Sequence, residues 1–249
     1  MKPEERIIVA LDVPTAGEAL ALVEELEGLV SFYKVGLELL LAGGLENLLV
    51  RLVRDSKVFV DLKLPNDIPE TVRRAVAVAT RLGVTFLTLS HSATRETLRA
   101  AIAGRAGSVH PRLLFVPVLS SLDGSDFAGA TQKPASEFGE DLVRRAKSAE
   151  GDGVDGFIIS GREIGLMRKA FPHATLVSPG IRPAGSPTDD HKRSCTPAEA
   201  IRLGADYIVV GRPIRNAAHR RDAARRIIDE IADAPASPGG GRATASAGG

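Results

Sequence analysis

Eight short apolar runs recur along the chain, and they constrain its fold more than any other feature. Each run is rich in β-branched or other apolar residues, as buried strands are. The runs cover Ile7 to Leu11, Phe32 to Gly36, Val58 to Leu62, Val84 to Leu89, Leu113 to Leu119, Gly156 to Ser160, Thr175 to Ser178 and Tyr207 to Val210. Because near-continuous apolar strands are buried on both faces, the runs predict a parallel sheet covered by helices.

Stretches with helical spacing lie between the apolar runs. The clearest are rich in Ala, Leu, Glu and Arg, and they cover Ala16 to Leu29, Pro69 to Arg81, Ala135 to Glu150 and Pro197 to Leu203. Helix-start signals occur at Thr15, at Ser92 to Glu96 and at Thr196, and Gly204 ends the helix before the last run. Eight such units in a chain of 249 residues favour a single-domain α/β fold, a closed (β/α)8 TIM barrel, over an open doubly wound sheet.

The alternating pattern stops near residue 233, so we expect the barrel to occupy residues 1–233. Residues 234–249 consist mainly of Ala, Gly, Pro and Ser and predict a disordered tail. Two long connections, Ser120 to Pro134 and Gly180 to Cys195, are rich in Gly, Pro, Ser and Asp. Each follows a strand, which places both at the carboxyl end of the barrel, where active sites form.

Charge and cysteine content exclude several classes of protein. The chain has 32 Lys and Arg against 31 Asp and Glu, and this formal net charge of +1 gives no field that would favour nucleic acid or an anionic membrane. The single Cys195 cannot form an internal disulfide, and no apolar run approaches the roughly 18 residues of a membrane span. With no signal-peptide pattern at its start, the sequence predicts a cytoplasmic protein without nucleic-acid or membrane partners.

Three ionisable residues follow the third apolar run, in Asp61-Leu62-Lys63-Leu64-Pro65-Asn66-Asp67. Asp61 and Lys63 are two positions apart, so on an extended backbone their side chains project to the same face. If that face is the barrel interior, the two charges are forced together, and Asp67 adds a second carboxylate whose presence shifts their proton affinities. A salt-bridge cluster on the surface is the alternative.

Two other strands bring charges to the same end of the barrel. Asp12 ends the first run, and Lys34 lies in the apolar setting Phe32-Tyr33-Lys34-Val35-Gly36. A lysine is seldom buried without a partner, so we expect Lys34 and Asp12 to join the Asp61 cluster. The alternative for Lys34 is a side chain that reaches solvent past its aliphatic stem.

The last quarter of the chain carries two similar strand ends. Arg182 lies in Ser178-Pro179-Gly180-Ile181-Arg182-Pro183, and Gly211 and Arg212 lie in Val210-Gly211-Arg212-Pro213. In a barrel, the loops after the seventh and eighth strands commonly bind phosphate, and a guanidinium matches phosphate oxygens. A single Gly-Arg-Pro is more often only a turn, but two on adjacent strands predict a phosphate site.

The sequence carries neither the ligand spacing of a closed zinc site nor a glycine-rich nucleotide fingerprint that opens a helix. His91 follows the fourth run, and we interpret it as a structural or hydrogen-bonding group rather than a catalytic base. The sequence therefore favours chemistry without a cofactor and without a metal.

Together these motifs resemble the orotidine 5′-phosphate decarboxylase family, over nearly the whole chain from Ile7 to about Ile231. The most specific pieces are Asp61-Leu62-Lys63 with Asp67-Ile68-Pro69-Glu70-Thr71-Val72, Ser178 to Pro183, and Thr196-Pro197-Ala198-Glu199-Ala200-Ile201 leading to Val210-Gly211-Arg212-Pro213-Ile214. The resemblance implies a TIM barrel that decarboxylates orotidine 5′-phosphate to UMP without a cofactor. It also implies a homodimer with shared active sites.

The resemblance assigns a role to each candidate residue. Lys63 would protonate C6 of the pyrimidine as carbon dioxide leaves, and Asp61 would press on the substrate carboxylate. Asp67 would reach the active site of the neighbouring subunit. Asp12 and Lys34 would bind the ribose and support the charged array, which makes Lys34 a catalytic as well as a substrate-binding residue. The other substrate-binding residues would be Ser120 near the pyrimidine, in place of a usual threonine, and Arg182, Gly211 and Arg212 at the phosphate.

The chain departs from the family pattern in two places. Three residues, Leu64 to Asn66, separate Lys63 from Asp67 where the family usually has two, and we expect a tight bulge beside Pro65 to absorb the extra one. His191 stands where the family commonly has Gln. A neutral histidine donates one hydrogen bond but cannot reproduce both functions of an amide, so its contacts to phosphate and pyrimidine would differ.

Two other functions fit the same sequence features. A sugar-phosphate decarboxylase or aldolase of the same superfamily shares the Asp-X-Lys strand but uses Mg²⁺ to stabilise an enediolate. Alternatively, the chain is a non-catalytic barrel that binds UMP and has lost turnover through the shifted Asp67.

Overall fold

The computed structural model describes residues 1–183 and 195–234. Eight parallel strands close into a barrel in chain order, with β8 pairing back onto β1. The strands are β1 (Ile7–Ala10), β2 (Phe32–Gly36), β3 (Lys57–Leu64), β4 (Phe86–Leu89), β5 (Arg112–Phe115), β6 (Gly156–Ile158), β7 (Thr175–Ser178) and β8 (Tyr207–Val210). The single-domain (β/α)8 barrel predicted from the sequence is confirmed.

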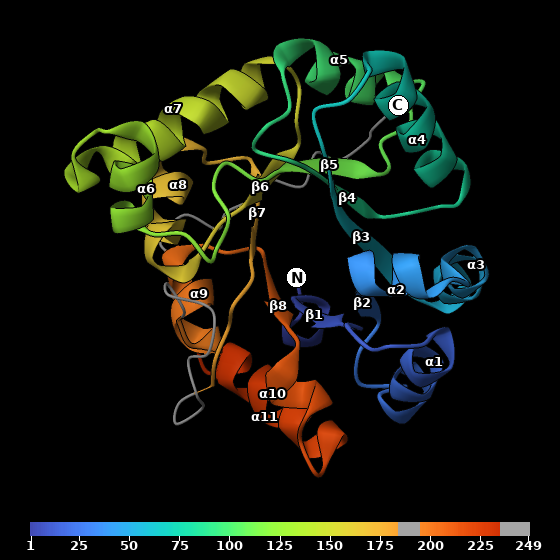
Figure 1. Cartoon of the computed structure of the whole chain (residues 1–249). Helices are drawn as coiled ribbons and strands as arrows, with labels where there is room; N and C mark the ends of the chain where they lie inside the picture. The colour runs from blue at the N-terminus through green and yellow to red at the C-terminus, as the bar shows by residue number, and fades with distance from the viewer. Residues whose placement is uncertain (184–194, 235–249) are drawn as a thin grey trace, which may run out of the picture.

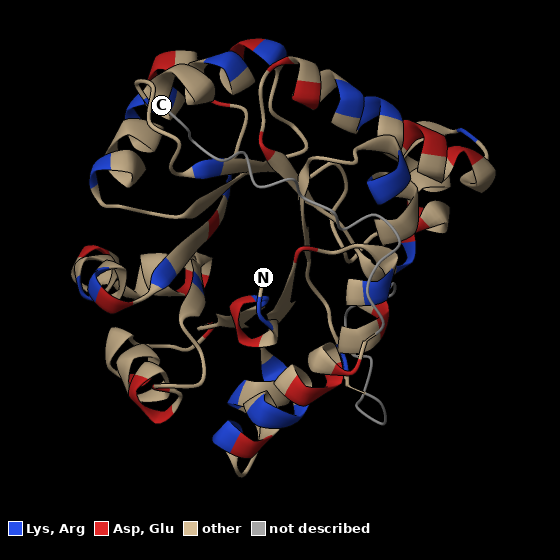
Figure 2. Cartoon of the chain, turned by 180° about the vertical axis from the view of Figure 1, so that it is seen from behind, with Lys and Arg blue, Asp and Glu red and all other residues tan. Residues whose placement is uncertain are grey.

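Helices form a ring around the strands, as Figure 1 shows. They are α1 (Ala16–Glu25), α2 (Leu37–Ala42), α3 (Leu45–Asp55), α4 (Pro69–Arg81), α5 (Arg95–Gly104), α6 (Gly124–Thr131), α7 (Phe138–Gly151), α8 (Ile164–Ala170), α9 (Pro197–Leu203), α10 (Arg212–Arg215) and α11 (Arg220–Ala232). Short 3-10 turns cover Pro3–Glu5, Ala135–Glu137 and Gly161–Glu163. Charged side chains of both signs are spread over this outer ring (Figure 2), and no helix in the described part of the chain is long and apolar enough to cross a membrane.

The predicted helix starts have the expected caps. The hydroxyls of Thr15 and Thr94 accept the N–H groups of Glu18 and Thr97, and Thr196 forms a reciprocal capping box with Glu199. Gly204 ends α9 at φ 109°, a left-handed conformation that glycine adopts without steric cost. These local signals fix where each helix begins or ends relative to its strand.

Several boundaries differ from the sequence prediction. The fifth strand ends at Phe115 rather than Leu119, because Pro117 has no N–H to continue the ladder. The predicted connection from Ser120 to Pro134 contains α6, whose glycine- and serine-rich start has low helix propensity. A capping box compensates: the Asp123 carboxylate accepts the N–H of Asp126, while the Asp126 carboxylate accepts the N–H of Asp123.

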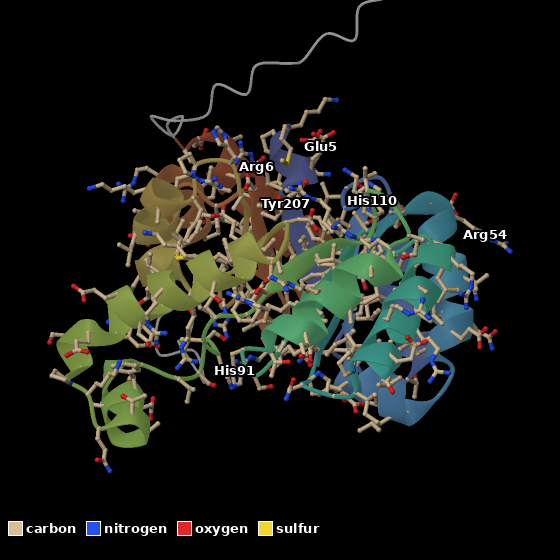
Figure 3. All side chains as sticks on the ribbon, turned by 90° about the horizontal axis from the view of Figure 1, so that it is seen from above. Glu5, Arg6, Arg54, His91, His110 and Tyr207 are labelled. Carbon is tan, nitrogen blue, oxygen red and sulfur yellow. The ribbon has the colours of Figure 1, made fainter. Side chains whose placement is uncertain are left out.

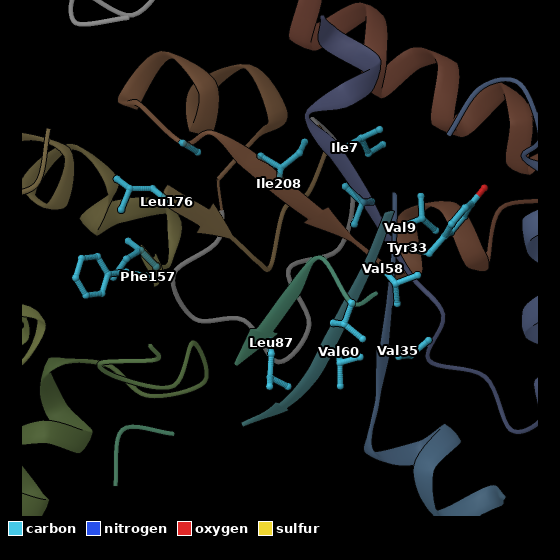
Figure 4. Packing of buried hydrophobic residues seen from close by; sticks show 14 of the residues in the cluster. Ile7, Val9, Tyr33, Val35, Val58, Val60, Leu87, Phe157, Leu176 and Ile208 are labelled. Carbon is cyan, nitrogen blue, oxygen red and sulfur yellow. The ribbon is translucent and has the colours of Figure 1, made fainter. Parts of the chain in front are cut away.

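The core has two layers, as expected for a barrel. An outer cluster lies between strands and helices and includes Ile7, Val9, Tyr33, Val58 and Ile208 (Figure 4). The second cluster fills the barrel interior and contains Ile8, Ala10, Phe32, Phe59, Phe86, Leu114, Val116, Ile158, Val177 and Val209. Three of its rings, together with Tyr207, pack at centroid distances of 5.1–6.0 Å and close the interior below the site.

Candidate active site

A cavity of about 600 Å³ opens at the carboxyl end of the barrel. Its floor is the top of the inner core: Ala10, Phe59, Val116, Ile158 and Val209 line it. Its polar lining brings together eight of the residues predicted from the sequence, namely Asp12, Lys34, Asp61, Lys63, Ser120, Arg182, Gly211 and Arg212. The cavity therefore lies where active sites of such barrels form.

The alternation of side chains along the strands explains this polar layer. Residues two positions apart in a strand share a face, so Lys34 stands above Phe32 and Asp61 above Phe59. In the same way Thr88 stands above Phe86. Strands β2 to β4 thus place polar groups directly above three phenylalanine rings of the inner core, where they are shielded from solvent.

The charged groups form one connected array. Nζ of Lys34 lies 2.8 Å from Oδ1 of Asp12 and 3.7 Å from Oδ2 of Asp61, and Nζ of Lys63 lies 2.9 Å from Oδ1 of Asp61. The side chain of Lys34 is 10% exposed and that of Asp61 is 16% exposed, whereas that of Lys63 is 39% exposed. Of the two lysines, Lys63 is therefore the one whose ammonium is more open to a molecule in the cavity.

The environment of Asp61 lowers the pKa of its carboxyl group. Burial alone would raise this pKa, because it disfavours the charged form. The charges of Lys34 and Lys63, with hydrogen bonds from Lys63 and Thr88, outweigh the burial effect. Asp61 is thus an ionised carboxylate held between two ammonium groups.

The backbone around Lys63 is not extended, contrary to the argument from the sequence. Lys63 has φ 47°, and the pairing of β3 with β4 shifts register between Val60 and Leu64. The side chains of Asp61 and Lys63 do meet, but a bulge in the strand brings them together. This bulge lies at Lys63 itself, not beside Pro65 where the sequence pattern placed it.

Asp67 lies away from the array within the chain. Its side chain is exposed, it does not line the cavity, and its Oδ1 accepts the N–H of Ile68 at 2.6 Å. The preceding residue anchors this loop, since Oδ1 of Asn66 accepts the hydroxyl of Thr97 at 2.8 Å and the N–H of Thr94 at 3.2 Å. Within one chain, Asp67 therefore does not line the cavity that holds Lys63, and its role in the site stays a prediction.

The arginines cluster at the side of the cavity formed by the ends of β7 and β8. Arg182 and Arg212 both line the cavity, and Arg182 is only 7% exposed. Arg215, one turn after Arg212 in α10, also lines the cavity, and its guanidinium donates to the carbonyl of Asp12. This side has the cationic groups that an anion requires.

His91, considered from the sequence as a structural or hydrogen-bonding group, does not line the cavity. His91 is exposed, and Figure 3 places it toward the end of the molecule opposite Glu5, Arg6 and Tyr207. Its Nδ1 lies 3.5 Å from the hydroxyl of Ser90, and burial and Arg145 lower its pKa. His191 lies outside the described residues.

Two residues of the site escaped the sequence prediction. Thr88 was hidden in the apolar run Phe86-Leu87-Thr88-Leu89, where its inward direction follows from the alternation with Phe86. Arg215 lies three positions after Arg212, a helical spacing that places the two on neighbouring positions of one face.

Within residues 1–183 and 195–234, no group of three or more His, Cys, Asp or Glu side chains could hold a metal ion.

Comparison with known proteins gives a consistent result. Residues 5–227 match the model of the orotidine 5′-phosphate decarboxylase / HUMPS family. The orotidine 5′-phosphate decarboxylases of Bradyrhizobium sp. (strain BTAi1 / ATCC BAA-1182) and Rhodopseudomonas palustris (strain BisB5) are 48% and 47% identical to the chain. They align with 95% and 92% of it and with 96% of their own lengths. The crystal structure of orotidine 5′-phosphate decarboxylase from Lactobacillus acidophilus superposes with a TM-score of 0.76 at 32% identity, covering 91% of this chain and 99% of that one.

Proposed function

The chain belongs to the orotidine 5′-phosphate decarboxylase / HUMPS family and decarboxylates orotidine 5′-phosphate to UMP in pyrimidine biosynthesis, and we propose that Lys63 donates the proton in this reaction. The observation that carries the proposal is the array in which Asp61 lies between Lys34 and Lys63. It stands at the cavity floor, with three arginines at the cavity's other side.

The chemistry requires a cation where Lys63 stands. When the bond between C6 and the carboxylate breaks, carbon dioxide leaves and an electron pair stays on C6. An ammonium that is already in place stabilises this charge without solvent reorganisation. Lys63 then transfers its proton from Nζ to C6, which gives UMP, and the neutral amine regains a proton from solvent.

Asp61 serves this step in two ways. Its hydrogen bond to Nζ of Lys63 holds the ammonium at a fixed position. Its own charge, kept by a lowered pKa, would lie against the substrate carboxylate and repel it until carbon dioxide leaves. Such repulsion would destabilise the bound substrate relative to the transition state.

The rest of the cavity would hold the nucleotide. Asp12, Lys34 and Ser120 line the cavity. In this proposal Asp12 and Lys34 would bind the ribose, and Ser120 would contact the pyrimidine. The phosphate would lie against Arg182, Gly211 and Arg212, with Arg215 as a further cation nearby. Binding energy at the phosphate can then be used to hold the pyrimidine against Lys63.

We further propose a homodimer in which Asp67 reaches the neighbouring active site. Exposed apolar side chains support this, since Leu41 is 84% exposed and Ile68, next to Asp67, is 67% exposed. Both follow strands whose carboxyl ends border the cavity, and Leu37 at the start of α2 lines it. A second copy of the chain that covered this rim would bury these residues and bring a carboxylate with it.

The proposed reaction needs no metal or organic cofactor, because the positive charge at C6 comes from Lys63. A cytoplasmic location, where pyrimidine nucleotides are made, completes the proposal.

Conversion of orotidine 5′-phosphate to UMP by the purified protein, with and without EDTA, tests the proposal. We expect turnover that survives EDTA. Binding of UMP without any turnover would instead identify a binding barrel. Activity on a sugar phosphate that appears only with Mg²⁺ would identify the metal-dependent sister enzyme.

A further inference from the structure

The strand that carries Lys63 has a bulge opposite Thr88. In the ladder between β3 and β4, Val60 pairs with Leu87 and Leu64 pairs with Leu89. The three residues from Asp61 to Lys63 therefore stand opposite Thr88 alone, and Lys63 takes φ 47° within this bulge. A side chain with a Cβ rarely adopts that conformation, so the surroundings must hold it.

The hydroxyl of Thr88 provides the contacts that hold the bulge. It accepts the backbone N–H of Lys63 at 2.8 Å and donates to Oδ1 of Asp61 at 3.0 Å. Thr88 is 0% exposed, so water does not compete for either bond. Because a hydroxyl has only one proton to donate, these two bonds fix its orientation as well as its position.

Asp61 and Lys63 are thus both hydrogen-bonded to one atom, the hydroxyl oxygen of Thr88. Oδ1 of Asp61 accepts hydrogen bonds from the Thr88 hydroxyl and from Nζ of Lys63. The same hydroxyl oxygen accepts a hydrogen bond from the backbone N–H of Lys63. Without the hydroxyl, the N–H of Lys63 has lost its partner in a buried strand, and the local backbone can relax toward an extended conformation. Such a relaxation would move Nζ relative to the substrate.

We propose that Thr88 is a positioning residue for the decarboxylation, holding the bulge that aims Lys63 and orienting the carboxylate of Asp61 beside it. Thr88 does not line the cavity and touches no reacting atom, so it acts only through these two residues. This role rests on the proposed function of Lys63 as proton donor.

Substitutions that separate the hydroxyl from the shape of the side chain test the proposal. Thr88→Val keeps the β-branched shape and removes both hydrogen bonds, whereas Thr88→Ser keeps the hydroxyl. Thr175→Val is the matched control, because Thr175 is also 0% exposed on an inner strand but its hydroxyl has no hydrogen-bond partner among the described residues.

Turnover is measured as kcat and KM for orotidine 5′-phosphate, together with the Kd for UMP. We expect Thr88→Val to lower kcat by about 10- to 100-fold, with KM and the UMP Kd changed by less than about threefold, because misplacement of a reacting group acts on the chemical step. Thr88→Ser should recover most of kcat, and Thr175→Val should resemble the wild type. Equal kcat for wild type and Thr88→Val, or equal losses in Thr88→Val and Thr88→Ser, would overturn the role of the hydroxyl.

Crystal structures of the wild type and Thr88→Val with UMP give a readout that does not depend on turnover. We expect Lys63 to leave its positive φ in the valine variant and Nζ to move away from Asp61. An unchanged Lys63 would overturn the proposal even if the wild type proved inactive. Absence of turnover in the wild type, by contrast, would refute only the proposed function.

Discussion

Oδ1 of Asp61 lies 2.9 Å from Nζ of Lys63, two positions later in the same strand, across a backbone bulge. The other oxygen of the carboxylate faces Lys34, so one buried anion holds two cations at the cavity floor. This arrangement orients Lys63 before any substrate binds. A charge that is already in place can stabilise the transition state without reorganisation of solvent during the reaction.

Lys63→Ala tests the proton donor directly. The variant should lose at least about 10³-fold in kcat, since it removes both the stabilising charge at C6 and the proton. Its Kd for UMP should change little, because the arginines at the other side of the cavity remain. Lys57→Ala, which removes an exposed lysine from the start of the same strand, is the control. Parallel loss of turnover and UMP binding would mean that Lys63 is structural.

Lys34→Met should change the dependence of stability on pH. The lowered pKa of Asp61 contributes stability that is present above the ordinary pKa of an aspartate and is lost as pH falls through the lowered value. Removal of Lys34 takes away the neighbouring charge with the larger coulombic effect on Asp61, so the pKa of Asp61 should rise and acid unfolding should begin at higher pH. At neutral pH we expect a loss of roughly 1–3 kcal/mol in the free energy of unfolding.

Urea unfolding of both proteins over a series of pH values measures this effect. A variant whose stability falls in parallel with the wild type from neutral to acid pH would show that Lys34 does not hold Asp61 ionised. Because the readout is unfolding, it does not depend on any role of Lys34 in binding the ribose.

The sequence predicted the barrel because its main determinant is local. Each apolar run has to be buried on both faces, and only helices on the outside and a filled interior achieve this for eight parallel strands. The predicted end of β5 was wrong because the run of apolar residues continues past Pro117, beyond the last backbone hydrogen bond of the strand. The helix α6 was missed because its stability comes from the cap at Asp123 rather than from the propensity of its residues.

The site was predicted less completely, for a physical reason. Residue type and strand position indicated Asp61 and Lys63, but their contact arises from a shift of register between β3 and β4, which depends on a neighbour distant in sequence. Thr88 supplies that long-range contact, and a threonine in an apolar run is common in any strand. The position of Asp67 depends on the hydrogen bonds of Asn66 to the start of α5, which the spacing pattern could not reveal.

Arg212→Ala tests the phosphate side of the cavity. Removal of the guanidinium should weaken binding of UMP and raise KM by about 10- to 100-fold, because hydrogen bonds to charged groups contribute roughly 1.5–3 kcal/mol. Uridine, which lacks the phosphate, should bind the variant and the wild type equally weakly. Arg226→Ala, at an exposed position of α11, is the control. An unchanged affinity for UMP would refute the assignment of Arg212 to the phosphate.

Asp67 provides the sharpest test of a shared active site. If each site combines Lys63 of one subunit with Asp67 of the other, Lys63→Ala and Asp67→Ala homodimers should both have very low turnover. Random exchange of subunits between them should restore about a quarter of the wild-type activity, because half of the dimers are mixed and each mixed dimer holds one intact site. Asp55→Ala, at an exposed position, should be fully active. Full activity of Asp67→Ala alone, or no recovery in dimeric mixtures whose subunits have exchanged, would mean that each chain works without its partner's carboxylate.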